Sequence, residues 1–289
     1  MTLYFKRYFH NWKPIIYDSI SFIGTAWVFL SITIHANKEF ADWTRNIALC
    51  ITLSVTCICL AICTNRPRTS FKYRLRDKDN DIEVKVGDAF TNSGSLVIPF
   101  NDHFDVSLGG NVKKANSLQS QLIQNYYSGR EKHLQQDIQD KTNAHKMSYS
   151  IGTVIKIEQK SKTFYLLVNS RKKKNNRVES SIEDFLLSLS KLWDYVASDA
   201  KRNTVVTIPL INTNHGRITN MTRITAIKEI IDSYIEASKS LDIAEELIIV
   251  IHPGDLKKGN INLDDINEYL SFCCKNYKIT KFSDKVEGK

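Results

Sequence analysis

The stretch Thr204–Arg217 reads Thr-Val-Val-Thr-Ile-Pro-Leu-Ile-Asn-Thr-Asn-His-Gly-Arg and decides the fold. Its first half, Val205–Ile211, is nearly continuous in apolar residues, which predicts a buried strand. Its second half is a polar turn containing Gly216, and Met221–Ser240 follows with helical spacing. In α/β domains, a buried strand that runs into such a turn and then a helix presents backbone N–H groups to an anion.

Other segments alternate between strand and helix patterns in the same way. Strands are predicted over Phe71–Arg76, Ile82–Val86, Ser95–Phe100, Ser150–Glu158, Lys162–Asn169 and Glu246–His252. Helices are predicted over Ser117–Tyr127, Ser181–Ser198 and Asn262–Cys273, whereas Gly129–Lys146 fits either a helix or a loop. This alternation predicts an α/β sheet that helices cover on both faces.

Two apolar segments precede these elements. Pro14–Ala36 has Asp18 as its only formally charged residue, and Asn46–Asn65 has none. Each is about 20 residues long, enough for a helix to cross the ~30 Å hydrocarbon core. Basic residues lie before the first segment and after the second, so the positive-inside rule puts both termini in the cytoplasm. We therefore expect a two-helix transmembrane hairpin in residues 1–66, with spans near 15–36 and 46–65, and a cytoplasmic domain at 67–289.

Two other interpretations of the apolar segments are a soluble helical hairpin and a cleaved signal peptide. The second segment has no polar stripe, which disfavours the soluble hairpin. No small-residue cleavage site follows the first segment, which disfavours the signal peptide. For Asp18 the sequence favours a place at the membrane interface over one facing a helix bundle or pore.

Composition restricts the partners. The 289 residues carry a net charge of +9, which indicates nucleic acid, an anionic membrane surface or an anionic ligand. The basic run Arg171–Arg177 lacks interleaved aromatic residues, so a solvated loop is favoured over a nucleic-acid surface. The six cysteines have neither zinc nor disulfide spacing, and His103, His215 and His252 are unrelated in spacing. The sequence thus predicts no metal site and no cofactor.

Polar clusters follow three of the predicted strands, at Gly87-Asp88, Asn101–Asp105 and Asn212–Arg217. Ligands of open α/β sheets bind at the edge formed by such strand ends. Asp88 suits the exocyclic amine of a base, or else it caps a turn. Asn101 suits a ribose hydroxyl, or else it forms an Asx turn.

The order of these motifs resembles a macro domain, a family that binds ADP-ribose and its derivatives. By this resemblance, Asp88 contacts adenine, Asn101 reaches the distal ribose, and Pro209–Arg217 forms the second phosphate loop. The first phosphate loop is expected at Val106–Val112, and Pro99-Phe100 replaces the usual Ala-Ala before the Asn. The resemblance implies a ligand site made by Asp88, Ala89, Phe90, Asn101, Asp102, Phe104, Asp105, Gly109, Gly110, Asn111, Asn212, Thr213, Asn214, His215, Gly216 and Arg217.

The whole chain is similar to the membrane effectors of type II Thoeris anti-phage systems. It shares their two spans, a Phe104-Asp105 pair after the Asn, and Asn-His-Gly-Arg in the second loop. In that family a TIR-domain partner makes an ADP-ribose conjugate, understood to be a histidine adduct, and the macro domain binds it. The membrane segments then oligomerise and disrupt the bacterial inner membrane, which kills or arrests the cell.

This resemblance implies a homo-oligomeric effector in the lipid bilayer that is not an enzyme and binds no nucleic acid. Two alternatives remain: a membrane-anchored hydrolase of ADP-ribose conjugates, and a non-toxic reader of ADP-ribose.

Overall fold

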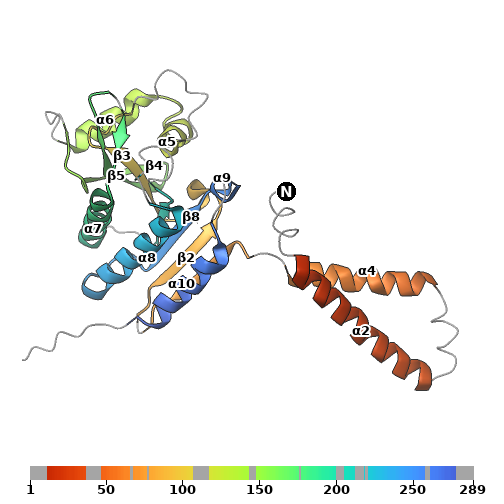
Figure 1. Cartoon of the computed structure of the whole chain (residues 1–289). Coiled ribbons are helices and arrows are strands. Elements are labelled where there is room, and N and C mark those ends of the chain that lie inside the picture. The colour runs from red at the N-terminus through yellow and green to blue at the C-terminus, as the bar shows by residue number, and fades with distance from the viewer. Residues whose placement is uncertain are drawn as a thin grey trace, which may run out of the picture. The chain divides into compact units, whose positions relative to one another are not determined.

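The computed structural model describes residues 12–36, 47–65, 68–76, 78–106, 117–142, 148–175, 177–199, 205–211, 218, 221–257 and 261–277. The chain divides into two compact units, Met1–Arg68 and Thr69–Lys289. The first unit contains helices and the second is built around a β-sheet (Figure 1).

The first unit contains α2 (Trp12–Ala36) and α4 (Ile47–Thr64), so both predicted spans are helical. Helix α2 is long and apolar enough to cross a membrane over Lys13–Thr33, judged by length and composition. The described apolar stretch of α4, Cys50–Thr64, is shorter. The crossing of a bilayer by both helices therefore stays a prediction.

The two helices contact one another near the start of α2 and the end of α4. The side-chain amide of Asn65 donates a hydrogen bond to Asp18 Oδ2 at 2.6 Å. Cys57 and Ala61 of α4 and Ser19 of α2 are buried at this end. Asp18 therefore contacts the end of the second helix, and its place at the membrane interface stays a prediction.

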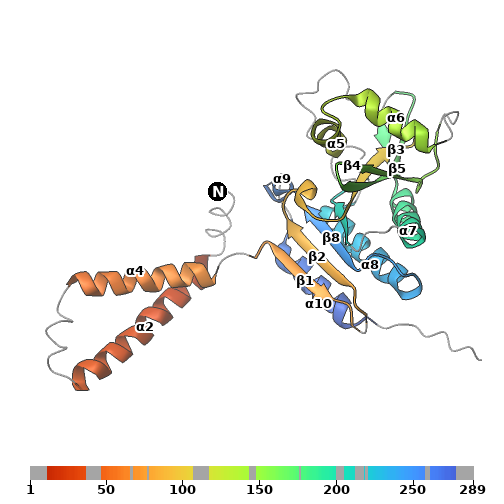
Figure 2. The same cartoon turned by 180° about the vertical axis from the view of Figure 1, so that it is seen from behind.

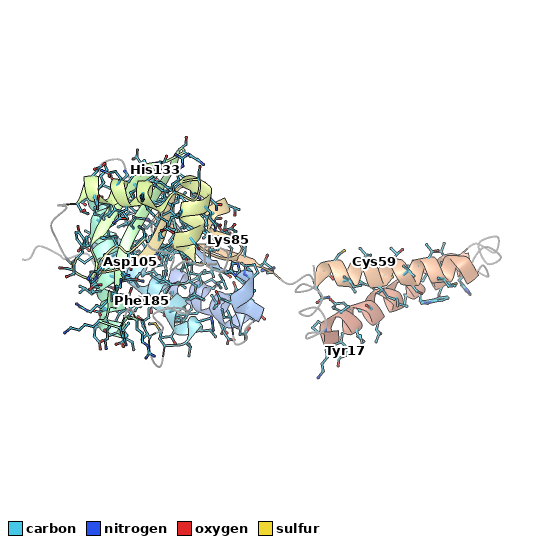
Figure 3. All side chains as sticks on the ribbon, turned by 90° about the horizontal axis from the view of Figure 1, so that it is seen from above. Tyr17, Cys59, Lys85, Asp105, His133 and Phe185 are labelled. Atoms are coloured by element: carbon cyan, nitrogen blue, oxygen red, sulfur yellow. The ribbon has the colours of Figure 1, made fainter. Side chains whose placement is uncertain are left out.

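The rest of the helix surface is apolar and exposed. Figure 3 labels Tyr17 and Cys59, which both lie on the outside of the helix pair. The large apolar side chains left exposed are Ile16, Tyr17, Ile20, Trp27, Val28, Phe29, Ile32, Ile51, Val55, Ile58, Leu60 and Ile62. Helical hydroxyls such as Thr25 and Ser54 donate to the carbonyl four residues earlier, so they need no water. An apolar surface of this extent is typical of a helix pair covered by lipid or protein.

The second unit is an eight-stranded mixed sheet with the order β1-β2-β8-β7-β3-β5-β4, and β6 pairs with β5. The strands are β1 (Ser70–Arg74), β2 (Asp81–Val86), β3 (Ser95–Asn101), β4 (Val154–Gln159), β5 (Lys162–Lys172), β6 (Val178–Glu179), β7 (Val205–Pro209) and β8 (Glu246–Ile251). The helices are η1 (Ala89–Thr91), α5 (Leu118–Tyr126), α6 (Glu131–Lys141), α7 (Ile182–Ser198), α8 (Arg223–Ser240), α9 (Pro253–Lys257) and α10 (Leu263–Lys275). The α/β class with a mixed sheet and flanking helices is confirmed.

Helices cover both faces of this sheet, as the alternation of the sequence predicted. Along β3, Val97 faces the core beneath α7, α8 and α10, whereas Leu96 and Ile98 face the core beneath α5 and α6. The same alternation recurs along β8, where Ile249 and Ile248 face opposite sides. Figures 1 and 2 show the two helical layers, with β1 and β2 beside α10. Two-sided burial explains why the central strands lack a polar face.

Several predicted boundaries were wrong. The strand expected over Ser150–Glu158 begins only at Val154, because Gly152 has a positive φ of 84° and turns the chain. The ambiguous segment Gly129–Lys146 contains helix α6. The buried strand of the opening stretch ends at Pro209, although Leu210 and Ile211 remain buried.

The described residues of the basic run Arg171–Arg177 are mostly exposed, as the sequence favoured, but they do not form a simple loop. Arg171 and Lys172 extend strand β5 and pair with β6, so the run forms a β-hairpin. Arg171 bonds Asp184 through two nitrogens, which raises the pKa of its guanidinium. Carboxylates that were distant in sequence thus neutralise part of this charge.

Candidate functional site

The parallel strands place five carboxyl ends at one edge of the sheet. Strand β2 is parallel to β8, β8 to β7, β7 to β3, and β3 to β5. The chain leaves β2 at Gly87, β3 at Asn101 and β7 at Pro209, so the three predicted polar clusters begin at this edge. We call it the ligand edge.

Asp88 caps the short helix η1 directly after β2. Its Oδ1 accepts a hydrogen bond from the backbone N–H of Phe90 at 2.9 Å, and its backbone is extended. The turn-capping role considered from the sequence is therefore real. The residue is exposed, and no hydrogen bond to Asp88 Oδ2 is found among the described residues. One carboxylate oxygen holds the turn, and the other is available to accept from a base amine.

Helix η1 is fixed at its other end by Lys162. The Lys162 ammonium donates to the carbonyls of Phe90 and Asn92 at 2.6 and 2.9 Å. Burial lowers the pKa of this ammonium, while the charge of Asp88 acts in the opposite direction. Ala89 is buried in the core and Phe90 stacks with Tyr126 at 6.1 Å between ring centroids. A ligand at this turn therefore meets backbone and the Asp88 carboxylate rather than the Ala89 methyl group.

Asn101 organises the turn that follows β3. Its Oδ1 accepts hydrogen bonds from the backbone N–H groups of His103 at 3.0 Å and Asp105 at 3.1 Å. This is the Asx turn that the sequence offered as the alternative to ribose binding. Because the carbonyl oxygen is engaged, the group that remains for a ligand is the Nδ2 amide, a donor.

Phe104 has a positive φ of 46° in this turn. Its ring is buried and contacts Phe100 at 5.6 Å and Tyr149 at 5.1 Å between centroids. The ring therefore belongs to the core and not to a ligand cavity. Core packing and the bond from Phe104 N to Asn101 O hold a backbone conformation that bulky residues rarely adopt.

Asp102 and His103 form an oriented acid–imidazole pair beside Asn101. Asp102 Oδ1 accepts from the backbone N–H of Lys172 at 2.8 Å and lies 2.8 Å from His103 Nδ1. When Nδ1 carries the proton, Nε2 is the acceptor of this half-exposed imidazole. The Lys172 ammonium contacts Asp105 Oδ2 at 2.7 Å, which ties the turn to β5. The sequence placed Asp102 in the expected ligand site but did not single out the imidazole of His103.

Both predicted phosphate loops lie outside the described residues. The first includes Gly109, Gly110 and Asn111, and the chain enters it after Val106. The second is the run Asn212, Thr213, Asn214, His215, Gly216 and Arg217, which the chain enters from β7. Their roles in phosphate binding stay predictions.

Three residues at the ligand edge were not predicted from the sequence. His252 directly follows β8, whose last residue, Ile251, accepts a hydrogen bond from the Gly87 N–H at 3.0 Å. Arg223 Nε, at the start of α8, lies 3.3 Å from Asp255 Oδ1 in α9. Asp255 is buried, and Arg223 Nε is buried without a hydrogen bond. Arg223 and Asp255 come together only because β7 and β8 are parallel neighbours. The local sequence around either residue therefore does not predict the contact.

The spacing along this edge indicates the size of its ligand. Strands β8 and β7 lie between β2 and β3, so Asp88 and Asn101 are separated by three strand spacings, roughly 14 Å. A molecule that contacts both must be elongated, like a nucleotide with a diphosphate-linked sugar, rather than a single nucleoside. Within the described ranges, no three His, Cys, Asp or Glu side chains gather closely enough to hold a metal ion.

A mixed sheet with helices on both faces and polar residues at the carboxyl ends of its parallel strands defines a macro-domain-type α/β unit. The family model described as "Thoeris protein ThsA, Macro domain" matches residues 82–252, more than half of the chain. The chain belongs to this family. The matched residues run from β2 to His252 and so include every predicted ligand residue.

Solved structures with a similar fold include bacterial macrodomains of low sequence identity. The Oceanobacillus iheyensis macrodomain with MES bound is 15% identical, with 71% of this chain and 97% of that chain covered and a TM-score of 0.49. The same macrodomain with ADP has 15% identity, 69% and 97% coverage and a TM-score of 0.46. A macrodomain protein from Streptomyces coelicolor has 15% identity, 58% and 95% coverage and a TM-score of 0.36. A comparison with curated proteins gave no match.

Proposed function

We propose that this chain is a membrane-anchored defence effector whose second unit binds an ADP-ribose-derived signal. The observation that carries the proposal is the placement of Asp88 and Asn101, three strands apart at one edge of a Thoeris-family macro domain. Asp88 Oδ2 accepts from the adenine amine, and Asn101 Nδ2 donates to the distal ribose. The two loops that start at β3 and β7 then surround the diphosphate.

The signal is a histidine conjugate of ADP-ribose made by a TIR-domain partner. Its distal group lies beyond Asn101, where the Asp102–His103 pair and the Lys172–Asp105 ion pair offer polar contacts. Binding drives oligomerisation of α2 and α4 and disruption of the bacterial inner membrane. The exposed apolar surface of both helices supports a bilayer as their environment.

The test is the membrane potential of cells that contain the chain together with a source of the conjugate. The proposal predicts depolarisation in these cells and none when Asp88→Asn or Arg217→Ala is introduced. Asp88→Asn is the sharper variant, because the Asn amide oxygen still caps η1 whereas its NH₂ group cannot accept from adenine. Depolarisation that persists in both variants contradicts a ligand-gated effector, and binding without depolarisation favours the reader.

The oriented Asp102–His103 pair favours a second candidate function, hydrolysis of the conjugate. His103 Nε2 accepts a proton from water, and the hydroxide oxygen bonds to the ribose anomeric carbon as the bond from that carbon to the histidine group breaks. The departing histidine then takes up the proton from His103 Nε2. The products are ADP-ribose and free histidine. Purified chain that releases ADP-ribose, and loses this ability in His103→Gln, supports the hydrolase; binding without any release supports the non-enzymatic effector.

A further inference from the structure

A cavity of about 320 Å³ lies between the end of helix α5, the start of α6 and the end of strand β4. Its wall includes Tyr127 after α5, His133 and Asp137 of α6, and Gln159 of β4, and His133 is labelled in Figure 3. Every lining side chain carries a hydrogen-bonding group. The cavity therefore suits a polar guest, unlike the apolar cores on the two faces of the sheet.

The cavity lies away from the turn that Asn101 organises. Gln159 ends β4 and pairs with Lys162, the first residue of β5. Strand β5 is parallel to β3, and Asn101 at the end of β3 lies beside Ser170. The cavity is therefore near the amino ends of β3 and β5, whereas the ligand edge is formed by carboxyl ends. No residue of the cavity wall belongs to the ligand site expected from the sequence.

The acidic residue of this wall is already bonded within the domain. Asp137 Oδ2 accepts a hydrogen bond from the Tyr127 hydroxyl at 2.6 Å. Burial raises the pKa of that hydroxyl, and the bond to Asp137 raises it further, so Tyr127 stays protonated and keeps donating. Because this internal donor satisfies part of the carboxylate, Asp137 does little to attract a cationic guest.

The basic residues of the wall are not engaged in this way. Arg130 directly precedes α6, and His133 lies in its first turn. No hydrogen bond or ion pair of either side chain is found among the described residues. Lys160 adds a third basic group: its ammonium lies 6.0 Å from the Tyr126 ring centroid and donates to Asn125 O at 2.9 Å. This imbalance between free basic groups and a bonded carboxylate favours an anionic guest.

Ser128 contributes a further donor to the wall. It joins α5 to α6 with a positive φ of 53°, and Gly129 follows with a φ of 75°. Glycine adopts such angles without cost, whereas serine rarely does. Within the described ranges, no hydrogen bond to the Ser128 side chain is found. Serine at this position therefore supplies a hydroxyl that glycine would lack.

We propose that this cavity is a second binding site, which takes a small phosphomonoester. The Arg130 guanidinium has the planar fork that binds two phosphate oxygens, and His133 and Ser128 donate to the remaining ones. A phosphate group fills only part of the cavity. The rest of the wall is polar, so the alcohol portion of the ester is small and hydroxylated rather than apolar.

The experiment is a calorimetric titration of glycerol 3-phosphate into the full chain in phosphatidylcholine nanodiscs. Saturating ADP-ribose is present throughout, so that the ligand edge is occupied. Saturable binding is expected, and Arg130→Gln and His133→Ala should each weaken it about tenfold. The matched control is Lys132→Gln, which removes a positive charge from the same helical turn but not from the wall, and it should keep the parent affinity.

The compound that binds identifies the class of guest. Glycerol should not bind, and inorganic phosphate should bind more weakly than its ester because it fills less of the cavity. Equal affinity for inorganic phosphate and the ester overturns the assignment to a phosphomonoester. Weakening by Arg130→Gln and His133→Ala but not by Lys132→Gln supports it.

Failure of this site leaves the proposed function untouched. A folded chain that binds ADP-ribose but no glycerol 3-phosphate overturns the second site alone. Ester binding that survives both Arg130→Gln and His133→Ala also overturns it. A chain that binds the ester with this mutational pattern but takes up no ADP-ribose supports the second site and contradicts the proposed effector.

Discussion

Asn101 holds the backbone of Asp105: its Oδ1 accepts the Asp105 N–H at 3.1 Å while also accepting from His103 N at 3.0 Å. One side-chain oxygen thus fixes the turn that follows β3. The amide group on the same side chain is the part proposed to reach the ligand. Stability and binding therefore depend on different atoms of Asn101, and substitutions can separate them.

Asn101→Ala leaves two backbone donors without their acceptor. We expect it to destabilise the second unit by about 1–3 kcal/mol, the usual cost of unsatisfied donors. Asn101→Asp keeps the acceptor and should unfold at nearly the parent temperature, yet it should weaken ADP-ribose binding because the Nδ2 donor is lost. Thermal unfolding and calorimetric titration of both variants check this. An Asn101→Asp chain with parent affinity would remove Asn101 from the ligand site.

The sequence predicted the strand ends at the ligand edge but not the contacts made there. Apolar runs mark β2, β3 and β7, and the polar residues after them mark where the strands end, so Asp88 and Asn101 could be found from local pattern. Arg223 and Asp255 could not, because their contact depends on which strands are neighbours. The pairing of Lys172 with Asp105 was missed for the same reason: the charges are 67 residues apart.

The stability of the second unit should depend on pH through Asp81 of β2, which contacts two basic residues of the edge strand β1. Burial acts to raise the pKa of Asp81, but hydrogen bonds from Arg74 and Lys72 outweigh it and hold that pKa below its usual range. A lowered folded pKa means that the stabilisation is present above the unfolded pKa of about 3.9 and is lost as the pH falls through the folded value.

We therefore expect the unfolding temperature of the parent chain to drop more steeply below about pH 4 than that of Asp81→Asn. The matched control is Asp79→Asn, because Asp79 is almost fully exposed and its contact with Arg74 should contribute little. Thermal unfolding from pH 6 to pH 2 compares the three chains. Identical pH profiles for the parent and Asp81→Asn would refute this role of Asp81.

The Arg223–Asp255 ion pair should be costly to break from one side. Asp255→Ala leaves the buried Arg223 Nε without its carboxylate, a change that typically costs about 3–5 kcal/mol. The double variant Arg223→Met with Asp255→Leu removes both charges and should recover much of that loss. Urea unfolding of the parent, single and double variants measures the difference. A double variant less stable than Asp255→Ala would contradict this account.

Cysteine accessibility tests the environment of α4. Cys59 is exposed on the described helix surface, so in nanodiscs lipid should shield it from a charged maleimide. Cys274 is shielded differently: burial raises the pKa of its thiol to about 12, which leaves little reactive thiolate. Both thiols should react with the maleimide in sodium dodecyl sulfate. A thiol placed at the exposed position 79 by Asp79→Cys should react rapidly in nanodiscs, without that detergent. Rapid labelling of Cys59 in nanodiscs would show that α4 is not in lipid.

The central claim is that an ADP-ribose derivative binds at the ligand edge through Asp88, and calorimetric titration of the full chain with ADP-ribose tests it most directly. The account predicts saturable binding with one ligand per chain. It predicts at least about a tenfold weaker Kd for Asp88→Asn, equivalent to 1.4 kcal/mol, at an unchanged unfolding temperature. A folded chain that takes up no ADP-ribose, or an Asp88→Asn chain with the parent affinity, would contradict it.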